Sequence, residues 1–428
     1  METLTSTIQE KTKLRWDDNN WKHLPKRWGH SFHPMCSYLA MFPPGIPRYF
    51  IEQFTKPGDI VLDPFSGRGT APLEACVSGR IGIGIDLSPL AYILTSAKLD
   101  PPSLRSSLRR INGLRANYKR SNVNVDDVPD NIKMLFDGRL TLPQIVYLRS
   151  ELSHKKKVDR FLLAALAGIL HGGYNDAMND SSYLSISMPN TFSMSPNYIR
   201  RYVRKNHLHK LSLDVFEKLT TKVRRLFKDG MPSTKGYAYR ANARNFASLK
   251  NPAFKDSSVK LIITSPPYLK VVNYGTYNWI RLWLLGESIE KTNKDLLLDD
   301  KHGIDNYENF LGDVLNQCER VLRPDGICAL VIGDVDEQDK NEERTSYNLS
   351  EGIWNRLKQK TKLKFLMIIE DSLPEKNKVT RIWGKTKGNA TKTDRILLLY
   401  KDKLPRPNHP YSAEKIISKL ISTNIHSR

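Results

Sequence analysis

The chain has 428 residues and a formal net charge of +22, with 67 lysines and arginines against 45 acidic residues. A positive charge of this size indicates a polyanionic partner, most simply nucleic acid. The longest apolar run, from Phe161 to Leu170, is too short to span a membrane and predicts a core helix. The length allows two or three domains, or one large domain that carries an insertion.

The termini and cysteines predict a reduced, intracellular environment. The N-terminus lacks the basic and apolar regions of a secretory signal, so we expect a cytoplasmic, nucleoid-associated protein. The four cysteines, Cys36, Cys76, Cys318 and Cys328, show no CxxC spacing, and none follows a proline. We therefore expect buried, reduced thiols and no metal site.

The first third of the chain predicts an α/β unit. Residues 1–27 are polar, and we expect them to be flexible. The block 28–100 is expected to form a βαβ unit preceded by a helix. Its expected elements are a helix at 47–54, a strand at 59–62, a helix at 71–78 and a strand at 81–85.

The rest of the chain is expected to hold an insert, a second α/β segment and a tail. Residues 101–235 are basic and mostly helical in pattern, with one helix expected across 208–227. Residues 236–404 return to an α/β pattern, and residues 405–428 form a basic tail with one short helix. The expected elements of the second α/β segment are strands at 259–264 and 327–332 around a helix at 307–321, then an antiparallel pair at 363–369 and 395–400. The predicted fold is a doubly wound, Rossmann-like α/β sheet with a C-terminal antiparallel hairpin and a mostly helical insert.

A glycine-rich loop follows the strand at 59–62. It reads Asp63-Pro64-Phe65-Ser66-Gly67-Arg68-Gly69-Thr70, and its two glycines permit a tight turn and close approach of a ligand. The spacing differs from the dinucleotide fingerprint GxGxxG, which favours a loop around a small nucleoside over a pyrophosphate cradle. Asp86 ends the next strand, where an acid can accept hydrogen bonds from ribose hydroxyls. It could otherwise cap the helix that starts near Pro89.

A second motif, Thr264-Ser265-Pro266-Pro267-Tyr268, ends the strand at 259–264. Each proline fixes its φ angle and removes an N–H donor. The Ser265 hydroxyl and nearby carbonyls are left as oriented acceptors, and Tyr268 offers a flat ring. This arrangement suits a planar ring that carries an amine. The alternative is a Pro-Pro turn that only ends a strand.

Together the two motifs resemble those of the S-adenosylmethionine-dependent amino-methyltransferases of DNA. The loop 63–70 resembles the family's cofactor motif. The segment 264–268 resembles its catalytic tetrapeptide, in the Ser-Pro-Pro-Tyr form associated with cytosine N4, whereas adenine N6 enzymes usually carry Asp or Asn in place of Ser265. Residues 33–47 resemble the N-terminal motif that packs against the methionine part of the cofactor, and Asn242 stands where the family contacts the adenine amine. The likeness covers roughly 28–99 and 237–400.

The resemblance implies S-adenosyl-L-methionine as the cofactor and a flipped base as the target. The implied cofactor-binding residues are Phe42, Pro43, Asp63, Pro64, Phe65, Gly67, Gly69, Thr70, Asp86 and Asn242. The implied catalytic residues are Ser265, Pro266, Pro267 and Tyr268, and no metal is needed. Cytosine C5 methylation is excluded, because it needs a cysteine nucleophile, usually after a proline.

The insert 101–235 carries none of these motifs and is the candidate target recognition region. Within it, Arg200, Arg201, Arg204 and Lys205 are the expected DNA contacts. The order of cofactor motif, insert and catalytic motif resembles the permutation group that places target recognition between the two halves. The alternative is a solvated basic cap over the catalytic domain.

These observations predict a site-specific methyltransferase that makes N4-methylcytosine in double-stranded DNA. It would act with a cognate restriction endonuclease in a restriction–modification system, or as an orphan. The open alternatives are an adenine N6 DNA methyltransferase, an RNA amino-methyltransferase and a nucleic-acid-binding protein without catalysis.

Overall fold

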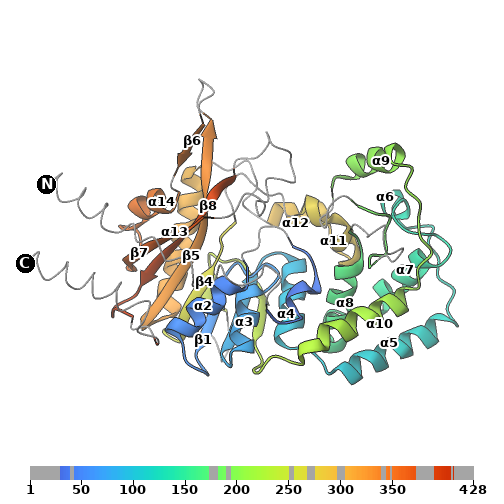
Figure 1. Cartoon of the computed structure of the whole chain (residues 1–428), viewed down its shortest axis with the longest axis horizontal. Coiled ribbons are helices and arrows are strands. Elements are labelled where there is room, and N and C mark those ends of the chain that lie inside the picture. Colours follow the sequence, from blue (N-terminus) through green and yellow to red (C-terminus); the bar gives the residue numbers. More distant parts are fainter. Residues whose placement is uncertain are drawn as a thin grey trace, which may run out of the picture.

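A computed structural model describes residues 29–38, 43–172, 182–188, 194–249, 255–267, 275–295, 304–338, 344–347, 349–372, 390–405 and 408. Within these ranges a single mixed sheet is covered by helices, and a group of further helices lies beside it (Figure 1). The predicted flexible N-terminus and tail helix lie outside the described residues. None of the described helices is long and apolar enough to cross a membrane.

The sheet has the doubly wound order predicted from the sequence. Its strands run β3-β2-β1-β4-β5-β8-β7, and β6 pairs with β5. The strands are β1 (Ile60–Asp63), β2 (Ile81–Asp86), β3 (Tyr237–Arg240), β4 (Val259–Thr264), β5 (Leu322–Gln338), β6 (Arg344–Tyr347), β7 (Lys364–Ser372) and β8 (Ala390–Tyr400). The first five pair in parallel, and β8 runs antiparallel to both β5 and β7. The predicted C-terminal antiparallel hairpin is therefore confirmed.

Both faces of the sheet are buried, which explains why its strands are nearly continuous apolar runs. In β4, Leu261 and Ile263 pack on the face covered by α2 (Gly45–Phe54), while Ile262 packs on the opposite face. The opposite face is covered by α13 (Ile304–Val321) and α14 (Leu349–Leu357). The strand order reverses between β1 and β4, so their carboxyl ends form the topological switch point where ligands bind in such sheets.

The predicted insert is mostly helical, and its helices gather on one side of the sheet (Figure 1). They are α5 (Leu104–Tyr118), α6 (Asp130–Lys133), α7 (Thr141–Glu151), α8 (Lys157–Ile169), α9 (Pro196–Lys205) and α10 (Val215–Leu226). Helix α8 packs on α4 (Pro89–Leu99), which follows β2, and the group shares one apolar core with α4. The short helices α11 (Trp279–Leu285) and α12 (Ile289–Asp295) follow the second motif, and α3 (Thr70–Val77) follows the first.

One predicted helix begins later than expected. The pattern at 208–227 predicted a continuous helix, but α10 starts at Val215. The Asp214 carboxylate accepts hydrogen bonds from the N–H groups of Phe216 (2.9 Å) and Glu217 (3.2 Å), which caps the helix there. Leu211 is consequently outside the helix and exposed rather than on its buried face.

The insert is fixed to the N-terminal motif by a close helix crossing. Helix α8 passes the short 3-10 helix η1 (His33–Met35) at Gly168, where an added Cβ would lie 1.8 Å from the Met35 carbonyl oxygen. From α10, the buried Lys222 ammonium donates to the Pro34 carbonyl at 2.9 Å. The burial of Lys222 and the charge of Arg225 lower the pKa of this ammonium to about 8. The crossing of α8 and η1 therefore needs a glycine at position 168.

We predict that Gly168→Ala lowers the free energy of unfolding by about 3 kcal/mol, because the backbone of Met35 leaves no room for a methyl group. The matched control is Gly113→Ala in α5, where nothing lies within 4 Å of the added Cβ. That change should raise the stability by about 1 kcal/mol through helix propensity. Thermal unfolding followed by circular dichroism measures both, and equal melting temperatures for the two variants would contradict the predicted crossing.

Candidate active site

The two sequence motifs meet at the carboxyl ends of β1 and β4. Asp63 and Thr264 are buried at these strand ends, and the Thr264 hydroxyl donates to Asp63 Oδ1 at 2.5 Å. The same oxygen accepts the Phe65 N–H at 3.1 Å. Residues 201 positions apart are thus joined directly. Ser265 and Pro266 follow Thr264 and leave the sheet beside the glycine-rich loop.

The glycine-rich loop lies close against α4. Gly67 and Gly69 have φ angles of +50° and +78°, which favour glycine. A Cβ on Gly69 would lie 2.7 Å from Thr95 Oγ1. The Thr95 hydroxyl also donates to the Gly67 carbonyl at 3.2 Å, and the Ser66 N–H donates to the Ile85 carbonyl at 2.9 Å. The loop is therefore held in shape by β2 and α4.

Asp86 at the end of β2 also holds this loop. Its Oδ2 accepts the Gly67 N–H at 2.8 Å, and its Oδ1 accepts the Ser88 N–H at 2.9 Å. The cap of α4 is Ser88, whose hydroxyl accepts the Ala91 N–H at 3.4 Å, so the alternative role of Asp86 as the helix cap is wrong. Each carboxylate oxygen has capacity for a further hydrogen bond.

The two aspartates form an acidic pair in a buried setting. Burial raises the pKa of Asp63 to about 7, against the lowering effect of the Thr264 and Phe65 hydrogen bonds, and the charge of Asp86 adds to the rise. Burial likewise raises the pKa of Asp86 to about 6, against backbone hydrogen bonds from Ser88, Gly67 and Leu87. A cationic ligand at this position would offset the cost of ionising both carboxyls.

The other residues predicted to bind the cofactor lie along the glycine-rich loop and just beyond β3. Pro64 and Thr70 are buried, and Phe65 is half-buried with its ring 5.6 Å from that of Phe310. Asn242 lies just beyond β3, where its side chain accepts the Arg244 N–H at 2.9 Å. The neighbouring Ala241 N–H donates to the Asp86 carbonyl at 3.1 Å, so Asn242 and Asp86 share one edge of the sheet.

Pro43 lies ahead of α2, and its carbonyl accepts the Ile46 N–H at 3.2 Å. Pro266 is buried, whereas Ser265 and Pro267 are half-buried. Phe42 and Tyr268 lie outside the described residues. The described residues contain no group of three or more His, Cys, Asp or Glu side chains that could hold a metal ion.

Sequence reasoning missed the buried polar groups behind the loop. Lys98 is fully buried in α4 and donates to the Arg68 carbonyl at 2.6 Å. Burial lowers the pKa of Lys98 well below its usual value, as do the charges of Arg68 and Lys222. Arg68 in turn donates to the His33 carbonyl at 3.3 Å, and His33 Nε2 contacts Glu74 Oε1 at 2.5 Å. A lysine within the apolar segment 89–99 was the available signal.

The four predicted DNA contacts lie on α9. All four are exposed, and α9 lies at the outer edge of the insert (Figure 1). Arg200 donates to the side chains of Asn131 and, at 3.3 Å, Asn197. The rings of Tyr198 and Tyr202 stack on the same helix with centroids 6.2 Å apart. The surface is therefore basic and aromatic, a combination that suits nucleic acid.

Comparison with known proteins finds similarity to DNA methyltransferases. Residues 4–95 match a family model for N6 and N4 methyltransferases described as DNA methylase. The type II methyltransferase M.MvaI of Kocuria varians is 24% identical over 306 residues, covering 67% of this chain and 62% of that protein. The type II beta methyltransferase M.BslI of Bacillus sp. is 51% identical over 56 residues, covering 13% of this chain and 6% of that protein.

Solved structures include a putative DNA modification methylase from Thermus thermophilus complexed with S-adenosyl-L-methionine. It is 20% identical, with a TM-score of 0.25, over 44% of this chain and 60% of that chain. The chain spans less than two thirds of the length of the curated relatives named above. The family-model match over residues 4–95 and the similarity to M.MvaI support the predicted amino-methyltransferase family, and they do not distinguish N4 from N6 transfer.

We predict that Asp63→Asn becomes progressively more stable than the wild type as the pH rises from 5 to 8 without ligand. Asp63 binds its proton more tightly in the folded chain, with a pKa of about 7, than in the unfolded chain, where the value is 3.8. The stability that this proton provides is therefore lost between about pH 4 and 7, and asparagine cannot lose it. Melting temperatures at several pH values measure the difference.

The matched control for this prediction is Asp325→Asn. Lys260 and Arg323 beside Asp325 hold the pKa of that carboxyl below its usual value, although partial burial opposes them. Asp325 is therefore ionised in both the folded and the unfolded chain over pH 5 to 8. The control should differ from the wild type by a constant amount, and the same constant difference for Asp63→Asn would contradict the raised pKa.

Proposed function

We propose that the protein transfers a methyl group from S-adenosyl-L-methionine to the N4 amine of a cytosine that is flipped out of double-stranded DNA. The observation that carries this proposal is the Asp63–Thr264 hydrogen bond, which joins the glycine-rich loop to the Ser-Pro-Pro segment. The match to the DNA methylase family supports the reaction class. The type II methyltransferases among the relatives support a role in a restriction–modification system.

The residues at the switch point fit this cofactor. The loop at Gly67 and Gly69 has left-handed backbone that brings the chain close to a ligand without side chains in the way. Asp86 has acceptor capacity for ribose hydroxyls, and the acidic pair of Asp63 and Asp86 suits a ligand that carries positive charge. Asn242 shares the edge of the sheet with Asp86 and is the proposed contact for the adenine amine. When bound, S-adenosylmethionine supplies the methyl group.

The proposed work of the protein is to position and polarise the target amine. The amine of cytosine is a poor nucleophile because its lone pair is delocalised into the ring. The Ser265 hydroxyl and the Pro266 carbonyl accept hydrogen bonds from its two N–H groups and fix the direction of the nitrogen. As the methyl group is transferred, the donor leaves as S-adenosylhomocysteine and one amine proton is released to solvent. Tyr268 stacks on the base. Most of the acceleration then comes from orientation and from fixed dipoles at the amine.

A DNA substrate would account for the net charge of +22 and for the basic insert. A base inside a duplex cannot reach this site, so flipping costs a few kcal/mol of unstacking. Phosphate contacts from basic side chains offset that cost. We assign the two catalytic halves to residues 28–100 and 236–404, and target reading to the insert 101–235. Ser265, rather than an acid, is the basis for proposing cytosine N4 over adenine N6.

We predict that Ser265→Ala lowers the turnover number about 100-fold, because one acceptor for the amine is lost. Cofactor affinity measured by calorimetry should stay within about twofold, because the glycine-rich loop is intact. Ser248→Ala, the same change at an exposed position outside the two motifs, is the control and should leave turnover unchanged. Labelled methyl transfer to duplex DNA and to RNA measures turnover.

The product identifies the base. DNA from cells that express the protein should release N4-methylcytosine on digestion to nucleosides and mass spectrometry. N6-methyladenine as the sole modified base would contradict the proposed specificity while leaving the reaction class intact. Transfer to RNA alone, or failure to bind S-adenosylmethionine, would contradict the proposal itself.

We predict that replacing Arg200, Arg201, Arg204 and Lys205 with alanine weakens DNA binding and lowers the slope of log affinity against log salt by about 2 to 4. Each phosphate contact contributes about 0.9 to this slope. The control replaces three arginines and one lysine at α5 and its C-terminal end, on the other edge of the insert (Figure 1). The control residues are Arg105, Arg109, Lys119 and Arg120. Equal slopes for the two variants, measured by fluorescence anisotropy, would remove α9 from the DNA interface.

A further inference from the structure

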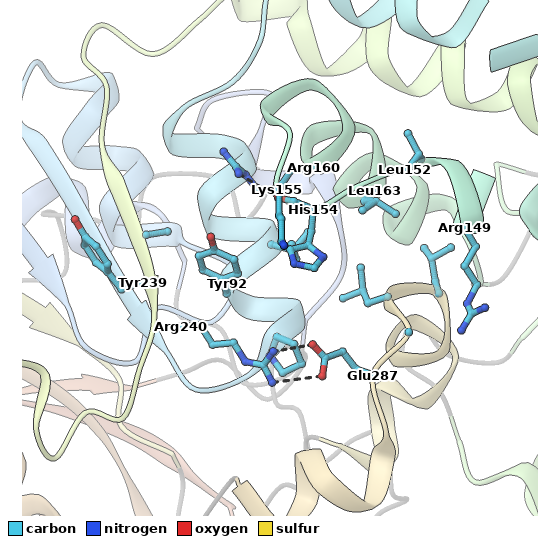
Figure 2. Close-up of a pocket in the computed structure, with 16 residues that line it drawn as sticks. Tyr92, Arg149, Leu152, His154, Lys155, Arg160, Leu163, Tyr239, Arg240 and Glu287 are labelled. Carbon is cyan, nitrogen blue, oxygen red and sulfur yellow. Dashed lines mark hydrogen bonds and ion pairs between the residues drawn. The ribbon is translucent and has the colours of Figure 1, made fainter. Parts of the chain in front are cut away.

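A pocket lies at the junction between the sheet edge and the insert, apart from the switch point. It has a volume of about 720 Å³ and is lined by α4, the end of α7 with the following turn, α8, β3 and α11. Pockets for small organic ligands fall in this size range, and a lone phosphate would fill only a fraction of it. Figure 2 shows the lining side chains, which include Tyr92, His154, Lys155, Arg160 and Arg240.

The pocket is separate from the proposed target-base position. It borders β3, whereas Ser265 follows β4, and β2 and β1 lie between these strands. Three strand spacings place the two sites roughly 14 Å apart. The pocket does approach the cofactor side, because Pro89 lies shortly after Asp86 and Arg240 shortly before Asn242.

The charge of the pocket favours an anion. Its single lining carboxylate, Glu287, is held by Arg240 at 2.7 Å and 3.4 Å (Figure 2). Arg149, Lys155 and Arg160 have no carboxylate partner among the described residues. The acid next to Arg160, Asp159, is taken by Arg110 at 2.8 Å.

The two arginines are held in place by carbonyls rather than by acids. Arg149 donates to the Trp283 carbonyl at 2.8 Å and lies over the Trp283 ring at 5.2 Å. Arg160 donates to the His154 carbonyl at 3.2 Å, and its buried Nε has no hydrogen-bond partner among the described residues. The pocket therefore carries fixed positive charge, and its arginines have more hydrogen-bond donors than the acceptors around them use.

The rest of the lining favours a planar group. Tyr92, Tyr239 and Pro89 contribute flat surfaces, and Ile93, Leu163 and Leu284 contribute apolar contact. A phosphate joined to a heterocyclic ring matches this combination of cations, rings and aliphatic side chains, because bases stack on aromatic side chains and phosphates pair with arginine and lysine.

We propose that this pocket binds a nucleoside 5′-phosphate unit, with Lys155 and Arg160 on the phosphate and Tyr92 against the base. The inference rests on the proposed function, which supplies nucleic acid as the substrate. The unit is either a nucleotide of the bound strand away from the target base or a free nucleotide. Both sources share the same chemistry, and the experiment distinguishes them.

The first measurement is calorimetric titration of the full chain with deoxycytidine 5′-monophosphate, in the presence of saturating S-adenosylhomocysteine to fill the cofactor site. Deoxycytidine and inorganic phosphate should each bind at least tenfold more weakly than deoxycytidine 5′-monophosphate. The variant Lys155→Ala with Arg160→Ala should bind the monophosphate at least tenfold more weakly than the wild type. The control, Lys156→Ala with Arg139→Ala, removes the same charges at exposed positions that do not line the pocket.

The second measurement is duplex DNA binding by anisotropy across salt concentrations. A drop of about 2 in the salt slope of the pocket variant, beyond that of the control, identifies a nucleotide of the bound strand. Loss of monophosphate binding with an unchanged slope identifies a free nucleotide. Equal behaviour of pocket variant and control in both measurements overturns the proposal, as does competition between the monophosphate and S-adenosylhomocysteine. Neither measurement uses methyl transfer, so a failure of the proposed reaction is detected separately.

Discussion

The hydrogen bond between Asp63 and Thr264 is the constraint on which the site depends. It joins the ends of β1 and β4, which lie next to each other in the sheet although the whole insert separates them along the chain. Parallel pairing aligns Leu62 with Ile262, and the Asp63–Thr264 hydrogen bond joins the two strands just beyond that pair. The glycine-rich loop and the Ser-Pro-Pro segment therefore leave the sheet from a common point, and neither motif has a defined partner until both strands are paired.

Helix α4 connects this point to the insert. One part of the helix faces the loop, where Thr95 contacts Gly67 and Gly69 and where Lys98 holds the Arg68 carbonyl. Other residues, including Leu90, Leu94 and Ala97, belong to the core that α4 shares with the insert. The cofactor loop and the insert are thus built on the same helix. A basic insert bound to DNA would therefore contact a helix that directly supports the loop.

The sequence predicted the elements whose signals are local. Apolar runs bounded by glycine and proline located β1, β2 and β4, and the apolar stretch from Phe161 located α8. The start of α10 was wrong because periodicity continued past Asp214, whose capping contacts outweigh it. Lys98 was missed because lysine is normally exposed, and its burial depends on a carbonyl in a distant loop. The pocket beside β3 could not be predicted, since Arg149, Lys155 and Arg160 meet Tyr239 and Arg240 only after the insert packs on the sheet edge.

The acidic switch point and the positive charge of the whole chain favour binding of the cofactor before DNA. Asp63 and Asp86 make the switch point acidic once they ionise, whereas the chain as a whole carries a net charge of +22. Near neutral pH a phosphodiester strand at the switch point would meet a largely ionised Asp86 and a partly ionised Asp63, which disfavour it. A cationic cofactor beside those carboxyls would reduce that repulsion and lower their pKa values. Under the proposed function, the cofactor would strengthen DNA binding at the site, and by linkage DNA would strengthen cofactor binding by the same factor.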